Sequence, residues 1–96
     1  MNQPKILIIA GSDSSGGAGV QADIKTATAH KVYSSSVITA LTAQSTQKVF
    51  AIHDVPIDFL RKQIDVVLED IHFDAIKIGM LSSVEIIDCV AMALKN

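Results

Sequence analysis

Apolar residues along this chain recur in two alternating patterns. Short runs rich in aliphatic and β-branched residues are typical of strands, and they occupy residues 5–10, 34–41, 49–55 and 73–80. Apolar residues three and four positions apart are typical of helices, and they occupy residues 18–30, 56–71 and 82–94. This alternation predicts crossover connections and a mainly parallel sheet with helices on both faces.

We therefore expect an α/β fold with three layers. The run at residues 5–10 is continuous between Pro4 and Gly11, as in a strand that is covered on both faces. Residues 49–55 are expected at an edge of the sheet or folded over it. Sheets of this class normally hold more strands than this chain supplies, so we expect an incomplete sheet. Its exposed sheet and helix surfaces would favour a homo-oligomer or association with another chain.

Two of the predicted helices carry local start signals. Pro56 suits the first turn of the second helix, because proline lacks only an N–H group that the first turn leaves unbonded. Ser82 and Glu85 have the spacing of a capping box, in which each side chain bonds the backbone N–H of the other residue. We therefore expect the last helix to begin at Ser82.

Composition narrows the classes of partner. The 96 residues carry a formal net charge of −2, and their Lys and Arg residues are scattered singly. Without a basic stripe, nucleic acid is not an expected partner. The apolar runs are far shorter than the ~20 residues that span a bilayer, so we expect no membrane insertion and a cytoplasmic location. The single Cys89 has no second thiol or His at metal-ligand spacing, so no metal site is predicted.

The Gly-rich stretch AGSDSSGGAGVQAD, residues 10–23, follows the first strand and invites comparison with phosphate-binding loops. A Walker A loop is excluded, because Gly17 and Ala18 stand where that motif needs Lys and Ser or Thr. A dinucleotide fingerprint is disfavoured, because six residues separate the strand from the first matching glycine and no acid follows the second strand. Two interpretations remain open: the wall of another ligand pocket, or a long turn with a helix cap.

Candidate ligand-binding residues lie where predicted parallel strands end. Ligands bind at the carboxyl edge of such sheets, which Gly11, Gln44 and Met80 would reach. Gln44 offers an amide donor and acceptor that suit an aminopyrimidine, or else it is a solvated loop amide. Met80 could pack against the face of a ligand ring, or it could belong to the hydrophobic core. Asp23 could contact a ligand or simply interact with the helix dipole.

Three motifs resemble the hydroxymethylpyrimidine/phosphomethylpyrimidine kinase family of the ribokinase-like superfamily. They are IAGSDSSGGAGVQAD at residues 9–23, VITALTAQ at 37–44 and AIKIGML at 75–81. The resemblance implies phosphorylation of 4-amino-5-hydroxymethyl-2-methylpyrimidine and then of its monophosphate, with ATP and Mg²⁺. By the same resemblance Gln44 binds the aminopyrimidine, and Gly11, Asp23 and Met80 shape or contact the same pocket.

In this family the catalytic Asp and the ATP pocket lie in a later Gly-rich segment. Nothing like that segment occurs here, so residues 1–96 are expected to be the N-terminal, substrate-side part of a single ribokinase-like domain. We find no catalytic residue and no binding motif for ATP or Mg²⁺, and we expect the segment alone to be inactive. The alternatives are a fragment of a pyridoxal-type kinase and a non-catalytic pyrimidine-binding or interaction module.

Overall fold

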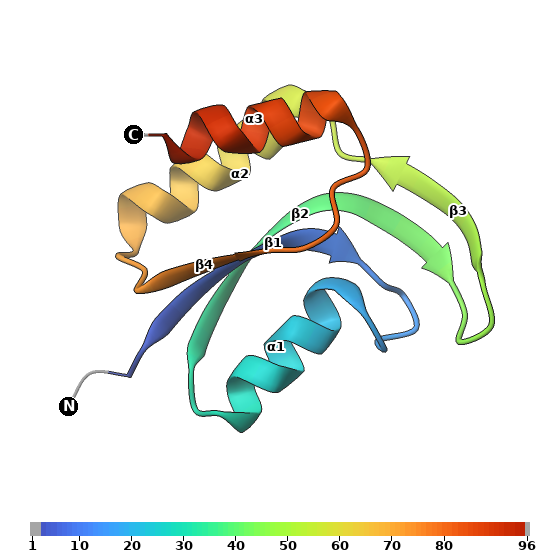
Figure 1. The fold of residues 1–96 in the computed structure, drawn as a ribbon, viewed down its shortest axis with the longest axis horizontal. Coiled ribbons are helices and arrows are strands. Elements are labelled where there is room, and N and C mark those ends of the chain that lie inside the picture. The colour runs from blue at the N-terminus through green and yellow to red at the C-terminus, as the bar shows by residue number, and fades with distance from the viewer. Residues whose placement is uncertain (1–2, 96) are drawn as a thin grey trace.

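Figure 1 shows the computed structural model, which describes residues 3–95, as a central sheet between two layers of helices. The elements follow in the order β1 (Lys5–Ser12), α1 (Gly19–Ala29), β2 (Tyr33–Gln44), β3 (Val49–Asp54), α2 (Ile57–Asp70), β4 (Ala75–Ile78) and α3 (Val84–Leu94). Every strand and helix predicted from the sequence is therefore present, which confirms the α/β class. Within the described residues, no helix combines the length and the apolarity that crossing a membrane requires.

The four strands lie in the order β3-β2-β1-β4. β1 is parallel to β2 on one side and to β4 on the other, whereas β3 runs antiparallel to β2. The prediction of a mainly parallel sheet is confirmed. The two alternatives for residues 49–55 are also decided, because β3 is an edge strand and all of its residues are exposed.

The middle of the central strand β1, residues 6–10, is continuously apolar because both of its faces are covered. Leu7 and Ile9 point to one face and join the larger core cluster, which includes residues of α2 and α3. Ile8 and Ala10 point to the other face and pack with Val20 of α1. All four strand residues are at most 2% exposed. Figure 1 shows the same arrangement, with α1 on one face and α2 with α3 on the other.

The pairing of β1 with β2 is irregular near the carboxyl end of β1. The register shifts between Ala10 and Ser12, as in a β-bulge, which re-aims the residues that follow. Gln63 of α2 satisfies the backbone of β2 beside this shift: its Oε1 accepts from Ile38 N at 3.0 Å and its Nε2 donates to Ile38 O at 2.9 Å. The second helix thus holds β2 where the strand departs from regular pairing.

The expected capping box at the last helix is wrong. The N-cap of α3 is Ser83, whose Oγ accepts from Ile86 N at 3.2 Å. Ser82 Oγ instead donates to Asp54 Oδ1 at 2.7 Å, which ties this segment to the end of β3. The helix starts one residue later than expected because the Ser82 hydroxyl is bound to another element.

Candidate functional site

A hollow of about 450 Å³ opens where the carboxyl ends of β1, β2 and β4 meet the start of α1. The four residues singled out from the sequence all line it: Gly11, Asp23, Gln44 and Met80. They come from four separate segments of the chain. The expectation that Gly11, Gln44 and Met80 converge at one edge of the sheet is therefore confirmed, and Asp23 of α1 lines the same hollow. Contact of these residues with a ligand stays a prediction.

The Gly-rich loop is folded around its own carboxylate. Asp13 is only 4% exposed, and its oxygens accept from Ser15 N at 2.8 Å, Ser15 Oγ at 2.7 Å and Gly17 N at 3.0 Å. The bond from the Ser15 hydroxyl is the largest cause that holds the pKa of Asp13 below its ordinary value of 3.8. Burial opposes this lowering, and the backbone N–H groups of the loop support it.

This loop geometry explains in physical terms why the stretch is not a phosphate cradle. In a phosphate loop the backbone N–H groups point at the ligand's oxygens. Here the N–H groups of Ser15 and Gly17 are bound to Asp13, and Gly16 N donates to Asp13 O at 3.0 Å. A negative carboxylate at the centre of the loop would also repel a phosphate. The loop is therefore suited to form a wall of the hollow.

Two glycines set the shape of that wall. Gly19 opens α1 at a φ of 60°, and a Cβ there would collide with the carbonyl oxygen of Gly11. Only glycine fits this close approach of the helix to the end of β1. At Gly11 a Cβ would meet the nearest atoms of Ala40 and Thr39 at ordinary distances of 3.6 and 3.9 Å. Packing within the chain does not require glycine at position 11, and its absent side chain leaves space in the hollow.

Gln44 ends β2 and is fixed to the Gly-rich loop through its backbone. Its N–H donates to Ser14 Oγ at 2.8 Å, and the same hydroxyl donates to Gln44 O at 2.7 Å. The side chain is half-buried, and its Oε1 lies 3.1 Å from Thr42 Oγ1. The amide is therefore a positioned group at the hollow, in contrast to the alternative of a freely solvated loop amide. Sequence reasoning missed both Ser14 and Thr42 as its partners.

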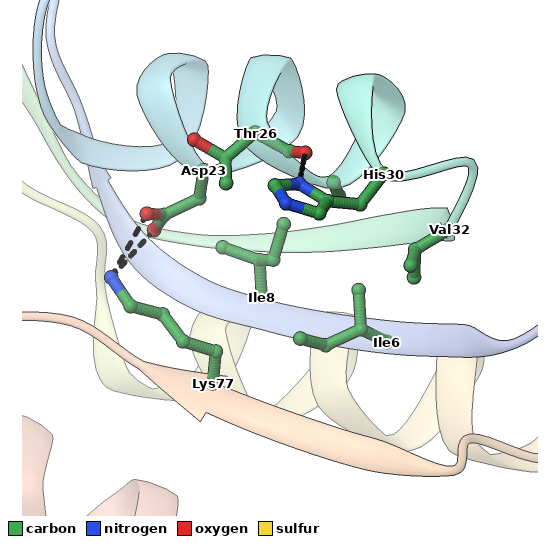
Figure 2. A pocket seen from close by; sticks show the side chains of 8 residues that line it. Ile6, Ile8, Asp23, Thr26, His30, Val32 and Lys77 are labelled. Carbon is green, nitrogen blue, oxygen red and sulfur yellow. Dashed lines mark hydrogen bonds and ion pairs between the residues drawn. The ribbon is translucent and has the colours of Figure 1, made fainter.

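Asp23 forms an ion pair between a helix and a strand. Both of its carboxylate oxygens accept from Lys77 Nζ at 2.9 Å, so that α1 is joined to β4 (Figure 2). Asp23 lies beyond the first turn of α1, which contains no acid, so the alternative role beside the helix dipole is not supported. Lys77 went unnoticed in the sequence, because a lysine between Ile76 and Ile78 matches the ordinary alternation of apolar and polar residues in a strand.

Met80 lies at the rim of the hollow and is 92% exposed. The alternative that it is an ordinary core residue is wrong, because β4 ends at Ile78 and the chain turns out of the sheet before Met80. An exposed, flexible thioether at the mouth of a hollow is available to cover the apolar face of a ligand ring.

A second hollow of about 300 Å³ lies between α1 and the sheet and shares the Asp23–Lys77 pair (Figure 2). Its remaining lining is largely apolar and includes Ile6, Ile8 and Val32. His30 borders it, but its ring Nδ1 lies 2.9 Å from Thr26 O on its own helix. This hollow therefore offers few free polar groups to orient a ligand, whereas the first hollow offers several.

The carboxylates that line the first hollow are already engaged. Asp13 holds the loop, and Asp23 is paired with Lys77. Neither is free to take a proton from a substrate hydroxyl, because each already accepts hydrogen bonds from groups of this chain. Between residues 3 and 95, no group of three or more His, Cys, Asp or Glu side chains could hold a metal ion. The hollow can therefore bind and orient a small polar ring, but its engaged carboxylates do not fit Mg²⁺.

Comparison with known proteins agrees with the three motifs. A family model described as phosphomethylpyrimidine kinase matches residues 13–96. The chain belongs to this family. Among curated family relatives, the hydroxymethylpyrimidine/phosphomethylpyrimidine kinase of Haemophilus influenzae is 50% identical over 90 residues, which cover 94% of this chain and 34% of that protein. The chain thus spans about a third of such a relative, and 18% of a longer thiamine biosynthetic bifunctional enzyme from rice, Oryza sativa.

Solved structures confirm the ribokinase-like fold. The crystal structure of phosphomethylpyrimidine kinase from Clostridium difficile is 53% identical, with a TM-score of 0.91, over 98% of this chain and 40% of that one. An ADP complex of Bacillus subtilis pyridoxal kinase is 38% identical, with a TM-score of 0.89, over 98% of this chain and 37% of that one. Kinases that are named for two different ring substrates therefore share the fold of this chain.

Proposed function

We propose that this chain is the substrate-binding part of a kinase that phosphorylates 4-amino-5-hydroxymethyl-2-methylpyrimidine and then its monophosphate. The observation that carries the proposal is the hollow at the carboxyl edge of the sheet, which Gly11, Asp23, Gln44 and Met80 line together. Relatives at about 50% identity that are named hydroxymethylpyrimidine/phosphomethylpyrimidine kinase support the substrate class. In this proposal Gln44 binds the aminopyrimidine, and the Gly-rich loop and Met80 enclose its ring.

The phosphoryl donor in this proposal is ATP, with Mg²⁺. Complexes of pyridoxal kinases with ADP and with AMP-PCP support the use of ATP. Because the carboxylates that line the hollow are engaged, we place the groups that move the phosphoryl outside residues 3–95 in this proposal. We therefore propose that residues 1–96 form the substrate-side part of one ribokinase-like domain, and the inactivity of the segment alone stays a prediction.

An activity assay tests the reaction. The natural gene product that contains these 96 residues is incubated with Mg²⁺-ATP and hydroxymethylpyrimidine, and the mono- and diphosphate products are measured. The proposal expects both products in succession. Absence of both products from a folded protein would contradict it. The same assay on the purified 96-residue chain is expected to give neither product.

Substitution of Gln44 tests the site. Gln44→Ala removes the amide that would pair with the aminopyrimidine, and we expect affinity to fall by about 1–3 kcal/mol, the usual cost of an unpaired polar group. Titration calorimetry with hydroxymethylpyrimidine measures this change. Gln47→Ala is the matched control, because Gln47 is exposed in the turn after β2 and does not line the hollow. Equal affinity of Gln44→Ala and the wild type would remove Gln44 from the site.

A second candidate function is the phosphorylation of pyridoxal. The observation that favours it is the TM-score of 0.89 and 38% identity with Bacillus subtilis pyridoxal kinase. Pyridoxal also carries a hydroxymethyl group on a six-membered nitrogen ring, so both substrates are placed in the same assay. Selective turnover of pyridoxal would make pyridoxal phosphorylation the favoured function in place of pyrimidine phosphorylation. Binding of the pyrimidine by the natural gene product without turnover would instead indicate a non-catalytic module.

A further inference from the structure

The Thr42 hydroxyl lies between two oxygen atoms, a carbonyl oxygen and an amide oxygen, that can each accept its proton. Its Oγ1 is 2.8 Å from Ser12 O and 3.1 Å from Gln44 Oε1. A threonine hydroxyl carries one proton and accepts through two lone pairs, so it can fully donate to only one of them. The carbonyl of Ser12 can only accept, whereas the amide of Gln44 can present either an acceptor or a donor.

Rotation of the Gln44 amide by half a turn satisfies all three groups. The amide oxygen and nitrogen are nearly equal in size, so their hydrogen-bond partners decide which of them faces Thr42. With Nε2 toward Thr42, the hydroxyl donates to Ser12 O and accepts from Gln44. We propose that Thr42 is a positioning residue that holds the Gln44 amide in this orientation and so sets which pyrimidines the hollow accepts.

The surroundings of Gln44 leave its side-chain orientation to Thr42. Ser14 fixes both backbone groups of Gln44, and Thr42 lies two residues earlier on the same strand, which places both side chains on one face of the sheet. The branched Cβ of threonine restricts its own rotamers, so the hydroxyl is held in place. Both side chains line the hollow.

This orientation gives the hollow a defined hydrogen-bonding pattern. One Nε2 proton is used by Thr42, and the second Nε2 proton and Oε1 remain for a ligand. They match a ligand edge on which an amino group stands beside an unprotonated ring nitrogen, as in a 4-aminopyrimidine. A 4-oxopyrimidine presents a carbonyl beside a ring N–H, which is the opposite pattern. The inference rests on the proposed function and adds to it that Thr42 favours amino over oxo pyrimidines.

Binding of two paired ligands tests the inference in the natural gene product. The ligands are hydroxymethylpyrimidine and its 4-oxo analogue, and the measured quantity is the ratio of their dissociation constants. The 4-oxo ligand would leave polar groups of Gln44 unpaired, so the wild type should bind the amino ligand more tightly by about tenfold or more. Thr42→Val keeps the shape without the hydroxyl and should reduce this ratio by about fivefold or more, whereas Thr42→Ser should retain it.

Ser82→Ala is the matched control, because Ser82 also lines the hollow but its hydroxyl bonds Asp54. This variant should keep the wild-type ratio. A general loss of packing would weaken the binding of both ligands alike and leave the ratio of their dissociation constants unchanged. An unchanged ratio in a folded Thr42→Val protein therefore overturns the inference.

A second measurement covers the case in which Thr42→Val does not fold. In the wild type, the side-chain amide protons of Gln44 should show nuclear Overhauser contacts to the methyl group of Thr42. Contacts of this kind support the orientation, and their absence from an assigned spectrum overturns it. If the wild type binds neither pyrimidine, the proposed function fails, while this spectrum still decides the orientation of the amide.

Discussion

At the scale of single residues, the Gly-rich stretch is organised by Asp13. Its carboxylate binds two backbone N–H groups and one hydroxyl of the same loop. These bonds favour the charged form and lower the pKa of Asp13, with the Ser15 hydroxyl as the largest cause. The loop that resembles a phosphate cradle in the sequence therefore already contains its own anion.

This bonding predicts a pH-dependent role for Asp13 in stability. A carboxyl group whose pKa is lowered by folding stabilises the protein above its unfolded pKa, and this contribution is lost as the pH falls through the folded pKa. Asp13→Asn should therefore lower the denaturant midpoint at neutral pH, and its difference from the wild type should shrink below the ordinary value of 3.8. Denaturant titrations at a series of pH values measure this difference.

Asp88→Asn serves as the control for charge removal, because Asp88 is an exposed carboxylate on α3. It should change the midpoint much less at neutral pH. A difference between Asp13→Asn and the wild type that stays constant across the whole pH range would contradict the role assigned to the charged carboxylate.

At the scale of elements, the start of α3 shows how tertiary contacts choose between neighbouring serines. Ser82 and Ser83 both precede an apolar helix. Ser82 binds Asp54 at the end of β3, and Ser83 takes the cap position. The connection from β4 to α3 is thereby joined to the edge strand at the rim of the hollow, where Ser82 is part of the lining.

The two serines give a matched pair of variants. Ser83→Ala removes the bond to Ile86 N and should lower the free energy of unfolding by about 1 kcal/mol, as for other N-cap serines. Ser82→Ala should cost clearly less, because its bond to Asp54 is exposed to water. Equilibrium unfolding in denaturant compares them. A larger loss for Ser82→Ala would show that the capping box expected from the sequence was the right one.

The order and type of the elements were predictable because local patterns determine them. The continuous run of β1 required cover on both faces, and the helical spacing of α2 placed Leu60 and Ile64 in the core, where both are fully buried. Convergence of Gly11 and Gln44 was predictable for a related reason, since carboxyl ends of parallel strands share one edge.

The partners within the site were not predictable in this way. Lys77 lies 54 residues from Asp23, and Thr42 meets Ser12 across 30 residues. Such pairs depend on strand register, which is set by the whole sheet and includes the shift between Ala10 and Ser12. The sequence pointed to four positions that line the hollow, and the structure was needed to find the side chains that hold them.

At the scale of the whole molecule, both edges of the sheet expose apolar side chains. Phe50 and Ile52 on β3 are 66% and 61% exposed, and Ile76 and Ile78 on β4 are 41% and 46% exposed. The chain also spans about a third of a curated relative such as the Haemophilus influenzae kinase. Edges of this kind favour pairing with further strands or with another chain, so association through these surfaces stays a prediction.

Two of the hollows in the described residues bear on the proposed site: one at the carboxyl edge of the sheet and a largely apolar one beside α1. The central claim is that the first of these holds an aminopyrimidine through Gln44. The location of the bound ring distinguishes the two hollows directly, independently of turnover.

The most direct test is a crystal structure of the natural gene product with hydroxymethylpyrimidine bound. The account predicts the ring in the hollow at the carboxyl edge of the sheet, within about 3 Å of the Gln44 amide and covered by Met80. A ring seated beside Ile6 and His30 under α1, with the Gln44 amide free of ligand, would contradict it.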